Sequence, residues 1–71
     1  MGQRVMVRER GAARVRSGHP WVYRSDVVEA EGEAGDVVAV FDRREGFLGN
    51  AFYNPKSEIS LRVAERQALL G

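Results

Sequence analysis

The side chains that could do acid–base or covalent chemistry are scarce in this chain of 71 residues. His19 is the only histidine, Lys56 is the only lysine, and cysteine is absent. A nucleophile needs a base beside it, and Ser17 lies near His19 without any glycine motif for an oxyanion hole. Zinc needs more than one histidine when no thiolate is available. We therefore expect no catalytic residue, no metal site and no enzymatic activity in this chain by itself.

The glycines of Gly46-Phe47-Leu48-Gly49 do not form a phosphate-binding motif. Glycine-rich nucleotide motifs require a helix directly after the loop, whereas this segment lies inside an expected hairpin. We therefore expect no nucleotide-derived cofactor in this chain.

What remains is the chemistry of a binding surface, gathered in the segment Ser17 to Val27, SGHPWVYRSDV. This segment holds the only histidine and the only tryptophan, and arginines flank its aromatic residues on both sides. Aromatic rings stack on unpaired bases, and arginines contact phosphates. The expected RNA-binding residues are Arg14, Arg16, His19, Trp21, Tyr23 and Arg24, with Tyr53, Asn54 and Lys56 as additions from the end of a later strand.

The same residues also have structural interpretations, which stay open at this point. Trp21 can be an anchor that caps the core and hides about 150–250 Å² of surface. His19, before a proline at a helix end, can donate to a carbonyl, and Asn54-Pro55 can be turn chemistry alone. The arginine richness can equally reflect a GC-rich genome or a thermophile's surface.

The net charge of +1 hides an asymmetry along the chain. Residues 1–24 contain six arginines and one acid, whereas residues 25–71 contain nine acids and five bases. Such separation predicts one positive face and one negative face rather than a uniformly basic protein. Ten of the eleven cations are arginine, which suits bidentate contact with phosphate.

The length indicates one domain, and a domain this small hides only about 60% of the surface of its unfolded chain. An apolar share of 44% favours a globular chain over a disordered one. The longest apolar run, Val37 to Phe41, is too short to span a bilayer, and residues 1–7 lack the apolar part of a signal peptide. We expect a soluble, cytoplasmic domain over residues 1–66, with residues 67–71 starting a linker.

Alternating apolar residues and turn signals predict five short strands and one short helix. The strands are expected at residues 3–8, 27–30, 36–42, 47–53 and 59–63, and the helix at 12–17. Gly11 is expected to break the first strand, and Gly18 to end the helix in a left-handed conformation. The run from Val37 to Phe41 indicates a strand covered on both faces, followed by a hairpin in which Gly46 takes the positive φ. From Ala64 onward the pattern predicts a helix or a linker.

Five short strands and one small helix cannot bury their apolar faces as an open flat sheet. We therefore expect a mainly β fold with a short α-helix, in which the sheet closes into a small five- to six-stranded mixed barrel. The helix would plug one end of this barrel, and Ser17 to Val27 would cross its mouth.

The order of several motifs along the chain is similar to that of a known family. RVRSGHPWVYRSDV followed by GEAGDVVAVFDRREGFLGNAFYNPKSEISLRV resembles the N-terminal PUA domain of the class I S-adenosylmethionine-dependent methyltransferases acting on cytosine C5 of large-subunit ribosomal RNA. The matching positions are Gly18, His19, Pro20, Trp21, Val22, Tyr23, Gly35, Asp36, Gly49, Tyr53, Asn54, Pro55, Ser57 and Ile59. Two positions depart from the family pattern: Ala51 replaces a frequent glycine and Ser25 a frequent asparagine.

The resemblance implies a mixed barrel of five or six strands and an RNA-binding module that positions ribosomal RNA. It also implies that a linking domain and a catalytic Rossmann-like domain, with the S-adenosylmethionine site and the reactive cysteines, lie elsewhere in the polypeptide. Two alternatives remain: a structural module that packs on the catalytic domain without binding RNA, and a PUA module of another RNA-modifying enzyme.

Overall fold

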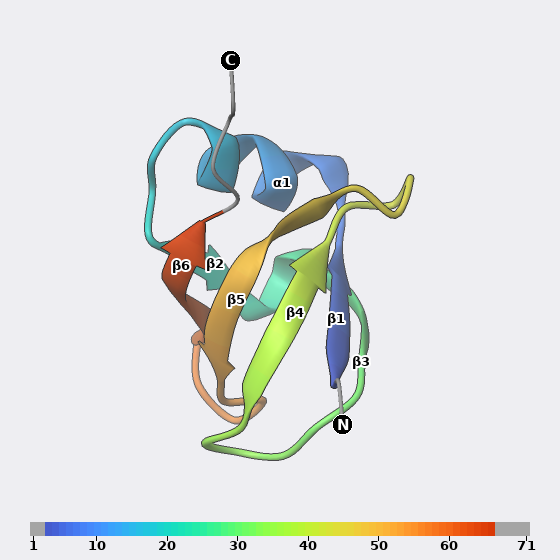
Figure 1. Cartoon of the computed structure of the whole chain (residues 1–71). Coiled ribbons are helices and arrows are strands. Elements are labelled where there is room, and N and C mark those ends of the chain that lie inside the picture. The colour runs from blue at the N-terminus through green and yellow to red at the C-terminus, as the bar shows by residue number, and fades with distance from the viewer. Residues whose placement is uncertain (1–2, 67–71) are drawn as a thin grey trace.

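The computed structural model describes residues 3–66. The elements follow one another along the chain as in Figure 1. They are β1 (Arg4–Val7), α1 (Glu9–Arg16), β2 (Trp21–Tyr23), the 3₁₀ turn η1 (Arg24–Asp26), β3 (Val27–Ala30), β4 (Val37–Phe41), β5 (Phe47–Tyr53) and β6 (Ile59–Arg66).

The strands form a single six-stranded sheet in the order β2-β6-β5-β4-β1-β3. The β1–β4 pair is parallel and the other four pairs are antiparallel, so the sheet is mixed. The sheet curls, and α1 lies over one end of it (Figure 1). This agrees with the expected mainly β, mixed fold of five to six strands. The barrel does not close by hydrogen bonds, because β2 and β3 remain the two edges and are joined only through η1.

The inner face of the sheet holds the apolar core. β-Branched residues alternate inward along the strands, as their preference for a pleated, half-buried surface predicts. Val15 and Ala12 of α1 complete the core from one end. The buried apolar residues are Val5, Val7, Ala12, Val15, Val22, Val38, Val40, Leu48, Ala51, Tyr53 and Leu61.

Gly11 does not break the chain after β1, as the sequence pattern suggested, but lies inside α1, which begins at Glu9. A Cβ on Gly11 would lie 3.1 Å from the Cβ of Asp26 and 3.3 Å from Cγ1 of Val22. Gly11 is therefore a packing residue, since its missing side chain lets α1 approach β2 and η1 closely.

The strand at Val37–Phe41 is fully covered on one face only, contrary to expectation, and Ala39 and Phe41 on its other face are half-buried. Val38 and Val40 are buried, whereas Val37 is 55% exposed. In the following hairpin Glu45, not Gly46, takes the positive φ, of 66°. Gly46 is required for another reason: a Cβ there would lie 2.9 Å from Oδ2 of Asp42.

The strand pairing corrects two further expectations about the elements of the chain. The segment Trp21–Tyr23 is a sixth strand, with Val22 opposite Leu61 of β6. Ala64 does not start a helix or linker, because β6 continues and Glu65 pairs with Asn50 of β5. The proposed linker at residues 67–71 lies outside the described residues.

Candidate nucleic-acid interface

The end of α1 fixes the entry of the segment that holds the candidate residues. Gly18 has φ of 104°, its N–H donates to the carbonyl of Val15, and the N–H of His19 donates to the carbonyl of Arg14. These two bonds form the Schellman motif, which satisfies carbonyls that the helix leaves free. The left-handed conformation expected of Gly18 is confirmed, and β2 starts three residues later.

Strand β2 separates its side chains onto two faces. Val22 is buried against the core, so Trp21 and Tyr23 lie on the opposite face, where Trp21 is half-buried and Tyr23 is exposed. Val22, rather than Trp21, is the fully buried residue that pins this segment to the core. The antiparallel register places Arg62 of β6 opposite Trp21.

Arg14 extends from the last turn of α1 onto this face. Its guanidinium carbon lies 5.2 Å from the centre of the Tyr23 ring, within the range of a cation–π contact. Its Nε is buried and has no hydrogen-bond partner in the part of the chain that the structure describes. A buried donor without an acceptor costs free energy, so an acceptor supplied by a ligand would relieve that cost.

Arg24 follows Tyr23 directly, and its backbone N–H donates to the carbonyl of Glu58, the residue before β6. Within the described residues, neither Arg24 nor Arg62 forms an ion pair with a carboxylate. We call the surface made by Arg14, Trp21, Tyr23, Arg24 and Arg62 the β2 face.

Arg16, expected on the same surface, is engaged elsewhere. Its Nη1 donates to Oε2 of Glu9 at 3.2 Å, and its Nη2 donates to Oδ2 of Asp42. Asp42 also accepts hydrogen bonds from the N–H groups of Gly46 and Arg44, at 2.7 and 2.9 Å. Chiefly the Gly46 bond, with help from Arg16 and Arg44, lowers the pKa of Asp42 below its usual value of 3.8. Arg16 thus stabilises the β4–β5 hairpin.

A second group of arginines is also held by the molecule's own acid. Asp26 is 1% exposed, and its Oδ1 accepts from Nε and Nη2 of Arg10 at 3.1 and 2.9 Å. Nε of Arg8 lies 4.0 Å from the same oxygen. These contacts join the start of α1 to η1, so Arg8 and Arg10 serve the fold.

The turn between β5 and β6 carries the remaining candidates. Oδ1 of Asn54 accepts from the N–H of Lys56 at 3.1 Å, so the side chain of Asn54 shapes the turn, as its turn interpretation proposed. Lys56 is exposed and forms no ion pair within the described residues. Tyr53 is only 7% exposed and belongs to the core, so its ring presents no surface for stacking. His19 is exposed, and the contact found for it is the backbone bond that ends α1.

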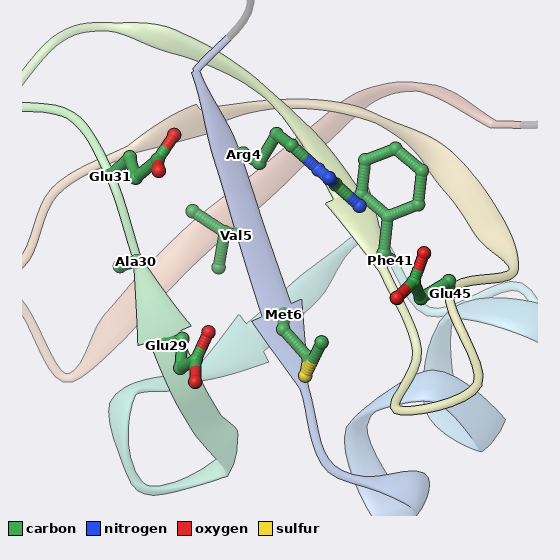
Figure 2. A pocket seen from close by; sticks show the side chains of 8 residues that line it. All are labelled: Arg4, Val5, Met6, Glu29, Ala30, Glu31, Phe41 and Glu45. Carbon is green, nitrogen blue, oxygen red and sulfur yellow. The ribbon is translucent and has the colours of Figure 1, made fainter.

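A shallow pocket of opposite character lies across β3, β1 and β4 (Figure 2). Glu29, Glu31 and Glu45 stand around it, and the Arg4 guanidinium lies 4.3 Å from the centre of the Phe41 ring. Its volume is about 490 Å³. The acidic residues of this pocket gather near the edge strand β3, but Arg4, from the arginine-rich part of the chain, lines the same pocket, so the expected separation into a positive and a negative face is incomplete there.

Arg62 was missed as a candidate because it lies near the far end of the sequence from the arginine-rich segment. Its place in the strand pattern, outward between the apolar Leu61 and Val63, was visible. Its pairing with Trp21 follows only from the fold.

Among residues 3–66, no cluster of acids and histidine has the arrangement of a metal site. Within the same range, no helix has the length and apolar character needed to cross a membrane.

A small curled mixed sheet with one helix at its end, and an aromatic and basic edge strand, defines a small, mainly β module. Residues 5–66 match the model of the PUA-like domain family, and the chain belongs to that family. The resemblance to ribosomal RNA methyltransferases is also confirmed. The chain is 45% identical over 62 residues to a ribosomal RNA large subunit methyltransferase of Deinococcus radiodurans, covering 84% of this chain and 15% of that protein.

Solved structures support the fold. A PUA domain from Aeropyrum pernix superposes with a TM-score of 0.65 at 19% identity, covering 96% of this chain and 42% of that chain. NSun6 from Pyrococcus horikoshii gives 0.69 at 20% identity, covering 89% of this chain and 18% of that chain. At these identities the likeness concerns the fold alone. The chain spans about 15% of the length of the curated relative that it matches.

Proposed function

We propose that this domain binds RNA through its β2 face and positions ribosomal RNA for a methyltransferase domain in the same polypeptide. The relatives that carry the same module are ribosomal RNA large subunit methyltransferases, which supports this assignment. In this proposal the longer protein acts in the cytoplasm, and S-adenosylmethionine binds to the catalytic domain rather than to this module.

The proposal rests on the arginines of the β2 face, which lack carboxylate partners within the described residues. Arg14 holds a buried Nε donor without an acceptor, and Arg24 and Arg62 have no carboxylate partner within the described residues. Phosphate oxygens are acceptors that suit guanidinium groups in shape and charge. Phosphate contacts of this kind position an RNA without reading its sequence.

The test is a fluorescence-anisotropy titration of the 71-residue chain with a labelled ribosomal RNA fragment at about 50 and 200 mM salt. If three or four phosphates of a single strand are engaged, the slope of log K against log salt is about −2 to −3. The double variant Arg14→Ala/Arg24→Ala should lose about 1.4 units of that slope, since each phosphate contact contributes about 0.7.

Arg43→Ala/Arg44→Ala is the matched control, because it removes the same charge from the β4–β5 hairpin, away from β2 (Figure 1). The RNA affinity of this control should fall by less than that of Arg14→Ala/Arg24→Ala. Equal losses in the two variants would indicate nonspecific attraction to positive charge and would contradict a site at β2.

The rival function is a packing module that contacts the catalytic domain and does not bind RNA. That function predicts no binding by the wild-type chain even at low salt. It also predicts that variants of Trp21 change the stability or activity of the longer protein without any change in RNA affinity.

A further inference from the structure

On the outward face of the sheet, Trp21 and Arg62 of the β2 face continue into a row of side chains that reaches β5 and β4. In register, Trp21 of β2 lies opposite Arg62 of β6, Arg62 lies opposite Phe52 of β5, and Phe52 lies opposite Val37 of β4. Residues directly opposite in neighbouring strands point to the same face. We call Trp21, Arg62, Phe52 and Val37 the outer row.

Phe52 is unusual among the aromatic residues of this chain. It is 52% exposed in the middle of a sheet, and Val37 beside it is 55% exposed. The other two phenylalanines, Phe41 and Phe47, contact each other, with ring centres 5.5 Å apart. The Arg4 guanidinium lies over the Phe41 ring. No ring or cation contact of Phe52 is found in the part of the chain that the structure describes. Adjacent exposed apolar side chains of this kind mark an interaction surface more often than isolated ones.

The order of residues in the row, a cation between two aromatic rings, suits a single-stranded nucleic acid, whose bases alternate with charged phosphates. Neighbouring strands lie about 4.8 Å apart, so the rings of Trp21 and Phe52, two strands apart, are about 10 Å from each other with Arg62 between them. This spacing leaves each ring to a separate base and puts the guanidinium where the connecting phosphate would run. Sheets that bind single-stranded RNA use aromatic residues on neighbouring strands in this way.

We propose that the outer row is a stacking subsite for two unpaired bases of RNA, with Phe52 and Trp21 as the stacking rings and Arg62 as the phosphate contact. The inference rests on the proposed RNA-binding function and extends it from the β2 edge across β6 to β5. Charge favours RNA as the occupant: Arg62 has no acidic partner within the described residues, and the row continues into Arg14 and Arg24 of the β2 face. Glu65, three residues after Arg62 on β6, accepts a hydrogen bond from Nδ2 of Asn50 at 3.1 Å and, in the described part of the chain, forms no ion pair with Arg62.

The experiment uses the 71-residue chain and a single-stranded oligonucleotide probe from the large-subunit ribosomal RNA, with anisotropy and tryptophan fluorescence as two readouts. Trp21 is the only tryptophan, so any quenching of tryptophan fluorescence by a stacked base reports on this residue alone. Phe52→Leu keeps apolar area but removes the aromatic face, whereas Phe52→Tyr keeps both. Phe52→Leu should weaken RNA binding by about 5-fold or more, and Phe52→Tyr should restore it.

Phe47→Leu is the control, because Phe47 is an exposed phenylalanine on the same strand but at the far end from the row. It should leave RNA affinity unchanged, and thermal unfolding of each variant separates a loss of fold from a loss of contact. Wild-type binding that is indifferent to Phe52→Leu, with no quenching of Trp21, would overturn the stacking subsite and leave the β2-face function standing.

Failure of the wild-type chain to bind any RNA would overturn both proposals together. If Phe52→Leu lowers the activity of the longer protein while the 71-residue variant binds RNA as the wild type does, the row is a protein interface, and the stacking subsite is wrong.

Discussion

The arginines of the β2 face have no carboxylate partner within the described residues; they are Arg14, Arg24 and Arg62. Two other arginines of α1 are paired: Arg10 with Asp26, and Arg16 with Asp42. Both groups are arginine, and the sequence does not distinguish them. The comparison teaches that the positive charge available to a polyanion is set by which cations the fold leaves unpaired, not by the number of arginines in a segment.

The acidic pocket at the opposite edge completes the comparison. Glu29, Glu31 and Glu45 form no ion pair within the described residues, and they stand near the open edge strand β3 (Figure 2). In the hydrogen-bonded order of the sheet, the basic, aromatic strand β2 is therefore one edge, and β3, beside the acidic residues, is the other edge. An RNA strand approaching the domain meets attraction at one edge and repulsion at the other.

The largest expected effect comes from the group of charges that serves the fold. Asp26→Ala removes the acceptor of the Arg10 hydrogen bonds and leaves a small void beside Gly11. Hydrogen bonds to charged groups contribute about 1.5–3 kcal/mol, so the free energy of unfolding should fall by about that amount. For a domain of this size the midpoint of thermal unfolding should fall by at least about 6 °C. RNA affinity at a temperature where the variant is folded should stay within 2-fold of wild type, and a large loss would show that Asp26 or Arg10 also serves the RNA surface.

A smaller effect on stability is expected at Asp42, and it depends on pH. Because the pKa of folded Asp42 lies below its usual value of 3.8, the unfolded chain binds more protons in acid. Its contribution to stability is therefore complete above about pH 3.8 and is lost as the pH falls through the lower pKa of the folded state.

Urea unfolding at several pH values tests this assignment. Asp42→Asn should lower stability near neutral pH by less than Asp26→Ala does, because the amide oxygen still accepts from Gly46. Its stability should also fall less steeply below pH 3.8 than that of the wild type. Identical acid dependence in both proteins would contradict the role of Asp42.

The position of Arg14 on the Tyr23 ring gives a smaller effect, on binding rather than stability. A cation–π contact at an exposed site contributes about 0.5–1 kcal/mol, so Tyr23→Ala should weaken RNA binding by about 2- to 5-fold. Tyr23→Phe keeps the ring and should bind as the wild type does. If Tyr23→Phe loses as much as Tyr23→Ala, the phenol hydroxyl is the contact and the ring does not hold Arg14 for the RNA.

Much of the fold was accessible from the sequence because its signals are local. Alternation in residues 47–53 and 59–63, the turn at Asn54-Pro55 and the left-handed Gly18 each depend on a few neighbouring residues, and the structure confirms them. Gly11 and Gly46 were misjudged for the opposite reason. Each is required by a close approach, of Asp26 to Gly11 and of the Asp42 carboxylate to Gly46, and the first of these distances arises only after the sheet has formed.

The candidate site was less accessible than the fold. The segment from Arg14 to Arg24 was singled out because its residue types are visible in the sequence, and its role in binding RNA stays a prediction. Arg16 and Tyr53 were included among the expected RNA-binding residues, although Arg16 is paired with Asp42 and Tyr53 is buried. Residue type and spacing do not reveal either fact, because both depend on distant strands. Asp42, which holds Arg16, is 26 residues from it in the chain.

The smallest effect is expected at the acidic pocket, and it sharpens the comparison of the two edges. Glu29→Gln/Glu31→Gln removes two negative charges from the β3 edge without changing their size. At physiological salt, exposed charges separated by more than about 8 Å are largely screened, and Glu29 and Glu31 lie toward the end of β3 that is farther from η1, the segment that joins β3 to β2. RNA affinity at that salt should therefore change by less than 2-fold, with a modest gain at about 10 mM salt, where the screening length reaches about 30 Å. A large gain at physiological salt would mean that the RNA passes close to the pocket, and the β2 face alone would then not describe its path.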